Sequence, residues 1–396
     1  METTDAFTGL RCTDCETLFD AAETPGRCPD CGGILDPEYD YDALDVTPET
    51  FSGEGRGLWR YESLLPFPES VAVTLDEGNT PLVEAPNLAE ELGVGQMYIK
   101  DEGRNPTGTF KDRGQAMAVT AAAQHDAETI ALATAGNAGQ AASAYAANAG
   151  MDSETFIPTR ASFINKAMIN VHGGEMTVVE GRIGDAGAAY DDAIADHPEW
   201  HSVKTFVTPY RHEGKKTMLY ETVEQLDWEL PDHVVYPTGG GVGLVGMHKA
   251  ATELRELGLT DDLPAMWAAQ SEGCAPIVKA FESGADEHEP WEQPDTICGG
   301  IEIPDPGASP LILDALEESG GGAVATPDEE ILEAALTVAQ KEGVEMGVTC
   351  SAATSGAQKL AQEGEFGEDD TVVLLNTGAW SKDADVIRSH LMSKGI

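Results

Sequence analysis

The chain has 396 residues, of which 41% are hydrophobic, and this is enough to bury a full core in two domains and a small appendage. It carries 70 acidic and 23 basic side chains, and the resulting formal net charge of −47 is spread along the whole chain. Such a surface repels nucleic acid and anionic membranes, so both are excluded as partners.

The excess of acidic residues also indicates the salt concentration at which the protein works. Like charges at this density destabilise a compact state at low salt, so we interpret the composition as that of a halophile's protein. The alternative is an ordinary acidic protein. No apolar run approaches the length of about 20 residues that a membrane span requires. The first residues, METTDAFTGLRC, lack the basic and apolar regions of a secretory signal, and a cytoplasmic location is therefore expected.

Four of the seven cysteines lie in two Cys-x-x-Cys pairs near the start of the chain: Cys12, Cys15, Cys28 and Cys31. Each pair can offer two thiolates to one tetrahedral zinc ion, and the two glycines after the second pair permit a tight turn. We therefore predict a zinc-ribbon-like module at residues 1–44. A disulfide pair, which a reducing cytosol disfavours, and a ribbon held by packing alone are the alternatives. The module contains only two basic side chains, which favours a structural or interface role over nucleic-acid binding.

For the rest of the chain, the sequence predicts a connecting arm followed by alternating strands and helices. Residues from about 45 to 75 are rich in aromatic residues and proline without a sustained period, which predicts a connecting arm. Strands are predicted at residues 97–100, 129–134, 154–157, 176–180, 234–236, 265–270 and 372–375. Helices are predicted at residues 110–124, 139–149, 161–171, 184–195, 214–227, 243–257, 328–341 and 352–362. This alternation indicates an α/β fold of parallel sheets covered by helices.

Lys111 stands in the first turn of a predicted helix. The helix dipole disfavours a positive charge there, which lowers the pKa of the amine and suits it to Schiff-base chemistry. The alternative is a solvated, salt-bridging helix face, because Asp112 and Arg113 follow directly.

Three loops follow predicted strands, at the edge where parallel sheets bind ligands. Asn137, in residues 134–143, can hydrogen-bond an aromatic oxygen or a carboxylate, or can cap the next helix. Residues 238–243 (TGGGVG) open a helix with consecutive N–H groups, which is the mechanism of a phosphate cradle. They lack the lysine of a nucleoside-triphosphate loop and so suit a permanently held cofactor phosphate. Thr377 ends the last predicted strand, where its hydroxyl can bond a ring nitrogen.

In this order, these segments resemble those of the fold-type II pyridoxal-phosphate enzymes, which are similar to the tryptophan synthase β-subunit, and within them those of the threonine synthase family. The resemblance runs over most of the chain. Besides the cysteine ribbon, the similar stretches are residues 77–82 (EGNTPL), 100–114 (KDEGRNPTGTFKDRG), 171–174 (VHGG), 209–217 (PYRHEGKKT) and 270–278 (QSEGCAPIV).

The resemblance implies two parallel-sheet α/β domains with the cofactor in the cleft between them. We expect a small domain at residues 88–210 and a large domain at residues 211–396, which the arm at residues 45–87 joins. A homodimer is also implied.

The resemblance further assigns roles to single residues. Lys111 would bind pyridoxal 5′-phosphate covalently and serve as general acid and base. Asn137 would contact the ring hydroxyl of the cofactor, and Thr377 its pyridine nitrogen. The cofactor phosphate would be bound by Gly239, Gly240, Gly241, Val242 and Gly243.

The implied reaction converts O-phospho-L-homoserine and water to L-threonine and phosphate, by γ-elimination and β-addition of water. Arg211 is the expected partner of the substrate phosphate, with Lys216 as a weaker candidate. A solvated helix start is the alternative for this basic run. The chain departs from the family pattern in its glycine-richer loop, in Thr208 where asparagine is expected, and in Gln140 where a small residue is common. These departures concern the substrate and not the cofactor.

Three other functions remain open from the sequence. A threonine or serine dehydratase and a β-replacement enzyme, similar to cysteine or cysteate synthase, share the fold. The third is a binding protein in which the ribbon is the active part and the remainder is an inactive scaffold.

Overall fold

The computed structural model describes residues 1–51 and 56–393. Two compact units share the chain, and both are discontinuous in sequence. Unit 1 consists of Met1–Asn79, Lys111–Met218 and Glu256–Leu259, and unit 2 of Thr80–Phe110, Leu219–Arg255 and Thr260–Ile396. The domain boundaries expected after residues 44, 87 and 210 stay predictions. No described helix has the length and apolar character needed to cross a membrane.

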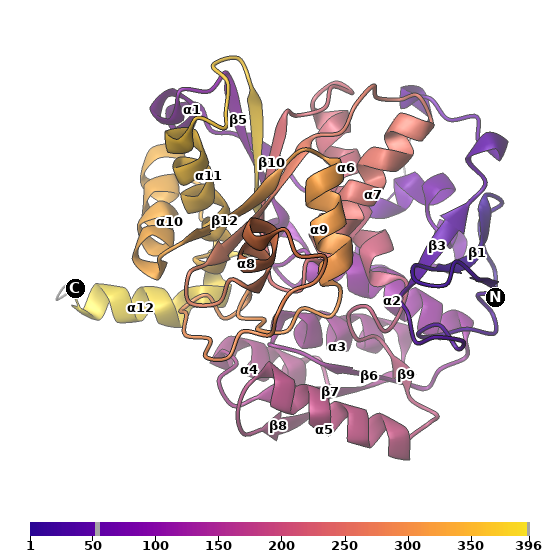
Figure 1. Ribbon diagram of the computed structural model, residues 1–396. Coiled ribbons are helices and arrows are strands. Elements are labelled where there is room, and N and C mark those ends of the chain that lie inside the picture. The colour runs from indigo at the N-terminus through magenta and orange to yellow at the C-terminus, as the bar shows by residue number, and fades with distance from the viewer. Residues whose placement is uncertain (52–55, 394–396) are drawn as a thin grey trace. The chain divides into compact units, whose positions relative to one another are not determined.

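Unit 1 begins with a small antiparallel sheet of order β2-β1-β3, drawn in indigo near the N-terminus in Figure 1. Its strands are β1 (Phe7–Cys12), β2 (Leu18–Phe19) and β3 (Leu35–Tyr39). Cys12 pairs with Leu35 across β1 and β3, so the first cysteine of the ribbon lies opposite the first residue of β3.

The second sheet of unit 1 is parallel and has the order β8-β7-β6-β9. It contains β6 (Thr129–Ala133), β7 (Asp152–Pro158), β8 (Glu175–Val179) and β9 (His201–Ser202). Its helices are α2 (Lys111–Gln124), α3 (Asn137–Ala149), α4 (Phe163–Val171), α5 (Ile183–Asp196) and the first half of α6 (Arg211–Gln225).

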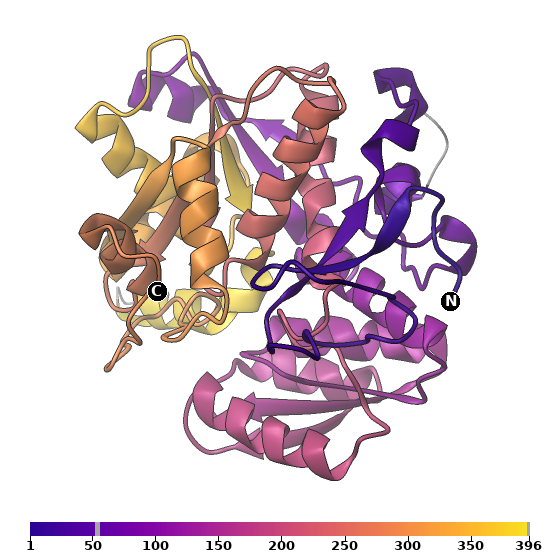
Figure 2. The ribbon, with the colours of Figure 1, turned by 45° about the vertical axis from the view of Figure 1, so that its right-hand side comes forward.

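Alternation along β6 explains how helices cover both faces of this sheet. Ile130 and Leu132 point into the core that α3 closes, whereas Ala131 points to the opposite face, against Tyr190 of α5. Figure 2 shows α3 and α5 on opposite sides of the strands.

Unit 2 is built on a six-stranded sheet of order β12-β11-β10-β13-β5-β4. The strands are β4 (Leu82–Glu84), β5 (Gln96–Asp101), β10 (His233–Pro237), β11 (Ala265–Ser271), β12 (Gly322–Thr326) and β13 (Thr371–Asn376). All neighbours are parallel except β4 and β5. The last strand in sequence, β13, lies between β10 and β5.

The helices of unit 2 include α1 (Pro86–Leu92), α7 (Val242–Glu256), α8 (Pro276–Ser283), α9 (Ser309–Glu318), α10 (Asp328–Glu342), α11 (Ala352–Glu363) and α12 (Ala384–Ser393). Helices α10 and α11 close an apolar core over the sheet, in which Ile99, Val235 and Leu374 from three neighbouring strands are fully buried. This burial is expected for parallel strands, which are covered on both faces.

The predicted α/β fold with parallel sheets is confirmed, and each predicted strand and helix is present with small shifts at its ends. Three of those shifts matter for function, because they place Lys111, Asn137 and Arg211 at the first residues of α2, α3 and α6. The sequence analysis did not find β12, which follows directly on a glycine-rich turn.

Candidate active site

The predicted site residues divide between the two units. Lys111 and Asn137 belong to unit 1, where each begins a helix and the two helices pack against each other. A Cβ atom on Gly139 would lie 2.8 Å from methyl groups of both Thr134 and Thr155, so only glycine allows α3 to approach the sheet so closely. The first turn of α3, with Asn137, is held in place by this contact.

Asn137 offers an unused acceptor. Its Oδ1 atom is buried and, among the residues that the structure describes, has no hydrogen-bond partner. An amide oxygen left in this state costs about 1–3 kcal/mol, so a ligand donor at this position would be stabilising. A protonated ring hydroxyl or a similar donor on a bound cofactor fits this requirement.

Asn165, on the first turn of α4, is a second buried amide that the sequence analysis did not single out. It is 5% exposed, and its Oδ1 atom also lacks a partner in the described part of the chain. A Cβ atom on Gly136 would collide with its Nδ2 atom, so Asn165 lies against the loop that leads into Asn137. The available signal was its place just after β7, at the sheet edge where ligands bind.

The glycine-rich loop of unit 2 joins β10 to α7. Gly241 has φ +70°, and a Cβ atom there would collide with Ile312, whereas a Cβ atom on Gly240 would meet nothing within 4 Å. The loop backbone is therefore packed on one side and open at its centre. The amides at the N-terminus of the 15-residue helix α7 suit a phosphate group.

Thr377 follows β13, the neighbour of β10, and so lies at the same sheet edge as the glycine-rich loop. Its hydroxyl is 3.2 Å from Sγ of Cys350. Burial raises the pKa of the Cys350 thiol to about 12, so it stays uncharged at neutral pH. The hydroxyl of Thr377 therefore lies beside an uncharged thiol.

The segment before Lys111 is fixed to this strand end. The backbone N–H of Phe110 donates to the carbonyl oxygen of Thr377 at 3.0 Å, and Thr109 forms an antiparallel bridge with Gly378. Lys111 is the next residue in the chain. The two residues before Lys111 are thus hydrogen-bonded or paired to the chain just after β13.

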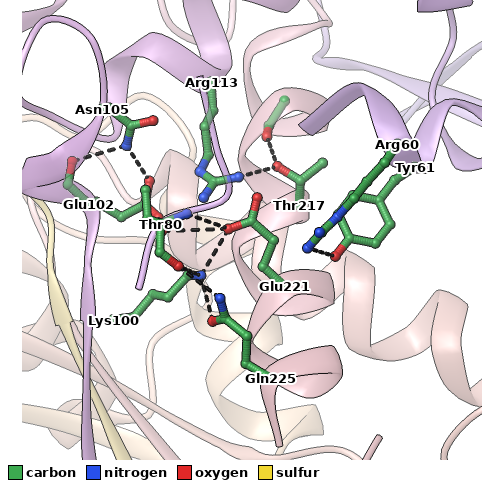
Figure 3. A network of polar contacts seen from close by, with 11 residues as sticks. Arg60, Tyr61, Thr80, Lys100, Glu102, Asn105, Arg113, Thr217, Glu221 and Gln225 are labelled. Atoms are coloured by element: carbon green, nitrogen blue, oxygen red, sulfur yellow. Dashed lines mark hydrogen bonds and ion pairs between the residues drawn. The ribbon is translucent and has the colours of Figure 1, made fainter. Parts of the chain in front are cut away.

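A buried polar network in unit 2 supports this segment (Figure 3). Lys100 donates to Glu221 at 2.9 Å and to the carbonyl oxygen of Thr80 at 2.8 Å, and both charged groups are fully buried. The hydroxyl of Thr80 donates to Glu102 at 2.6 Å, and Asn105 donates to Glu102 at 2.8 Å. The stretch at residues 77–82 therefore helps to hold the lysine-bearing segment.

Arg211 is a buried cation that forms no ion pair within residues 1–51 and 56–393. It is 1% exposed, and it donates to Thr205 Oγ1 at 2.6 Å and to the carbonyl oxygen of Val203 at 3.4 Å. Its Nε and Nη2 atoms have no partner among the described residues, and the same is true of the buried hydroxyl of Thr208. Burial lowers the pKa of Arg211 to about 10, so the guanidinium stays protonated at neutral pH and offers two donors to an anion.

Lys216 lies five residues along α6 from Arg211 and has different surroundings. Its ammonium is 2.7 Å from Glu213 and 4.3 Å from the centroid of the Tyr39 ring, and it is fully buried. An ammonium already neutralised in this way is a poorer partner for a substrate phosphate than Arg211.

The four cysteines of the ribbon lie together, with their sulfur atoms within 4.8 Å of one another. Cys12 and Cys31 are 3.5 Å apart, and Cys15 and Cys28 are 3.7 Å apart. A zinc ion with bonds of about 2.3 Å to four thiolates would set these distances near 3.8 Å. All four thiols are free. The donor set therefore fits a tetrahedral zinc ion.

The glycines after Cys31 have the conformation that such a turn needs. Gly32 has φ +79°, and a Cβ atom on Gly33 would lie 2.7 Å from the sulfur of Cys12. A larger residue at Gly33 would displace a thiol, whereas at Gly32 the space is open and the positive φ is what favours glycine.

Comparison with known proteins places the chain in a family. A profile of the family described as pyridoxal-phosphate dependent enzyme matches residues 73–378. The threonine synthase of Methanosarcina acetivorans is 37% identical over 379 residues, covering 96% of this chain and 93% of its own. That of Methanocaldococcus jannaschii is 36% identical, covering 95% of this chain and 93% of its own.

Solved structures show the same fold at lower identity. Maize serine racemase superposes with a TM-score of 0.67 and 16% identity, covering 80% of this chain and 94% of its own. A fungal L-serine ammonia-lyase from Rhizomucor miehei gives a TM-score of 0.66 and 21% identity, covering 77% and 97%. The chain belongs to the pyridoxal-phosphate-dependent enzymes of fold type II and, within them, to the threonine synthase family.

Proposed function

We propose that the chain converts O-phospho-L-homoserine and water to L-threonine and phosphate, with pyridoxal 5′-phosphate as cofactor. The observation that carries this proposal is the similarity to threonine synthases along 95–96% of the chain. A cytoplasmic location and a homodimer are part of the proposal and rest on the family resemblance alone.

The cofactor would be held by the residues that the family resemblance assigns to it. Lys111 provides the amine for covalent attachment, at a helix N-terminus where the dipole favours the neutral amine over the ammonium. Asn137 offers its unpaired oxygen to the ring hydroxyl, and Thr377 its hydroxyl to the ring nitrogen. The loop Gly239–Gly243 offers its amides to the phosphate. Thus each polar group of the cofactor has a chemically matched partner.

When bound, pyridoxal phosphate withdraws electrons from the amino-acid substrate and so makes the protons at Cα and Cβ removable. The chain supplies the proton transfers: Lys111 removes protons from Cα and Cβ as general base and, as general acid, returns one to Cα at the end. Phosphate leaves Cγ with the bonding electron pair, Cγ gains a proton, and water adds its hydroxyl at Cβ. Because Thr377 is neutral, it keeps the ring less electron-withdrawing than a carboxylate partner would, which suits this β- and γ-chemistry.

Arg211 is proposed to bind the substrate phosphate. Two of its guanidinium nitrogens lack partners in the described part of the chain, and the side chain is buried, so an anion there would form charge-assisted hydrogen bonds. The hydroxyl of Thr208 can donate to the same anion. The rival dehydratase reaction releases no phosphate and has no use for such a cation.

The test is to supply O-phosphohomoserine in high-potassium buffer with added pyridoxal phosphate and to measure free phosphate and threonine together. Equal amounts of both products are expected. Lys111→Ala should abolish both products and the absorbance of the lysine-bound cofactor. Lys279→Ala, which removes an exposed lysine paired with Glu289, is the control and should retain both.

Two other outcomes would replace the proposal. A keto acid formed from threonine or serine, without phosphate release from O-phosphohomoserine, would make the chain a dehydratase. A protein that takes up no pyridoxal phosphate would support the alternative of a binding protein, in which the ribbon is the active part and the remainder is an inactive scaffold.

A further inference from the structure

The cysteine ribbon is joined to the helix that carries Arg211, and both lie in unit 1. Asp36 of β3 is 2.6 Å from Nε2 of His212, the second residue of α6. Tyr39, at the other end of β3, donates its hydroxyl to Glu213 at 2.5 Å. One strand of the ribbon therefore holds two consecutive residues in the first turn of α6.

Tyr39 also contacts both members of a buried ion pair in α6. Glu213 accepts from Tyr39 and pairs with Lys216 at 2.7 Å, and Lys216 lies over the Tyr39 ring. Glu213 and Lys216 are fully buried, so this ion pair is stable only while its remaining hydrogen bonds are made. The ribbon thereby holds Lys216 in an ion pair, whereas Arg211 of the same helix keeps two nitrogens without a partner among the described residues.

The same strand is tied to the cysteine site. Leu35, the neighbour of Asp36, pairs with Cys12 across β1 and β3, and Cys31 lies five residues before Asp36. Leu35, Cys12 and Cys28 share one buried core with Tyr210, the residue before Arg211. A change in the geometry of the cysteines therefore reaches α6 through β3 and through this core.

We propose that Asp36 and Tyr39 are positioning residues for Arg211, and that the metal-binding ribbon thereby sets the affinity of the enzyme for the phosphate group of its substrate. This inference rests on the proposed function, because it assigns the ribbon a role at the substrate side of that reaction. It also gives a reason for the ribbon's attachment to a catalytic fold. A shift of Arg211 by a fraction of its hydrogen-bond length weakens phosphate binding without moving Lys111.

The first experiment compares Asp36→Ala/Tyr39→Phe with Glu38→Ala. Glu38 is on the same strand but pairs with Arg11 inside the ribbon, so it is a matched control. The double variant should raise KM for O-phosphohomoserine and the inhibition constant of inorganic phosphate on the order of tenfold, with kcat and cofactor absorbance little changed. Glu38→Ala should match the wild type. Phosphate constants that do not change in the double variant, or that change equally in Glu38→Ala, would overturn the proposal.

The second experiment tests the metal directly. Metal content is measured by mass spectrometry before and after chelation, and calorimetry then gives the dissociation constant of inorganic phosphate for the holoenzyme. Removal of the metal should weaken phosphate binding, and added zinc should restore it. Equal phosphate affinity with and without metal, or a protein that never contains metal, would refute the metal part of the inference.

Failure of the proposed function is a separate result. In that case the wild-type protein itself forms no threonine from O-phosphohomoserine. Failure of the present inference leaves wild-type activity intact and makes the ribbon variants indistinguishable from it.

Discussion

Arg211 and Lys216 belong to one helix and one basic run, yet their surroundings predict opposite consequences of mutation. Arg211→Met should raise KM for O-phosphohomoserine about 30- to 100-fold, because a charge-assisted contact contributes roughly 2–3 kcal/mol. Its stability should fall by only about 1 kcal/mol, because the guanidinium forms no ion pair with the described residues and loses only its hydrogen bonds to Thr205 and Val203. Lys216→Met should instead lower the free energy of unfolding by about 3 kcal/mol or more, since it removes the ammonium that pairs with the buried carboxylate of Glu213.

Steady-state kinetics and urea unfolding of the two variants separate these effects. An unchanged KM in Arg211→Met would end the assignment of Arg211 to the substrate phosphate.

Asn165 can be tested in the same way. Its buried amide oxygen has no partner in the described chain, so Asn165→Ala should cost little stability but should weaken the binding of substrate or cofactor by about tenfold. Asn170→Ala, at an exposed position of the same helix, is the control. A loss of stability without a change in either binding constant would mean that Asn165 has only a packing role.

These residues show where inference from sequence ends. The segments around Lys111, Asn137 and Thr377 could be found because their residue types and spacing are distinctive. Asn165 could not, because an unpaired amide is defined by burial and by the absence of a partner, which only the fold determines. The difference between Arg211 and Lys216 depends likewise on Tyr39, which is more than 170 residues away in the chain.

At the level of elements, the loop between β10 and α7 offers a sharp comparison. Gly241→Ala should weaken pyridoxal phosphate binding on the order of tenfold or more, because φ is +70° and the added methyl group collides with Ile312. Gly240→Ala places its methyl group in open space and should have a smaller effect. Cofactor titration followed by absorbance measures both. Equal affinities in the two variants would mean that the loop geometry does not determine phosphate binding.

The elements themselves were predicted with uneven success, for physical reasons. Strands such as β6 and β10 consist of apolar runs between turns and were found at their correct places. Strand β12 was missed because its GAVAT sequence is short, has mostly small side chains and follows consecutive glycines. The 8-residue helix α8 was missed because it is too short to show a helical period.

For the whole molecule, the net charge of −47 predicts a strong dependence of stability on salt. The screening length falls from about 30 Å at 0.01 M to about 3 Å at 1 M salt, so repulsion between carboxylates weakens over this range. The free energy of unfolding should therefore rise markedly from low salt to molar KCl, and similarly in NaCl. Urea unfolding at several salt concentrations checks this. Stability that is independent of salt would contradict the halophilic interpretation.

Acid should also destabilise the fold through His201. Burial and the nearby His125 lower the pKa of His201 from 6.5 to about 4. The unfolded chain therefore binds this proton more readily, and stability is lost as pH falls from about 6.5 to about 4, by at most about 3 kcal/mol. His201→Gln should flatten this part of the curve, whereas His197→Gln, at an exposed position, should follow the wild type. A curve for His201→Gln parallel to that of the wild type would show that other groups cause the loss.

The central place of β13 bears on how the protein is made. Every other strand of its sheet is synthesised earlier, yet β13 separates β10 from β5 and is hydrogen-bonded to both. Until Thr371–Asn376 has left the ribosome, these two neighbours present unpaired edges, and such edges invite pairing with other chains. The nascent protein must therefore keep two incomplete half-sheets apart from the synthesis of β10 until that of β13. Asn376, the last residue of β13, is followed at once by Thr377.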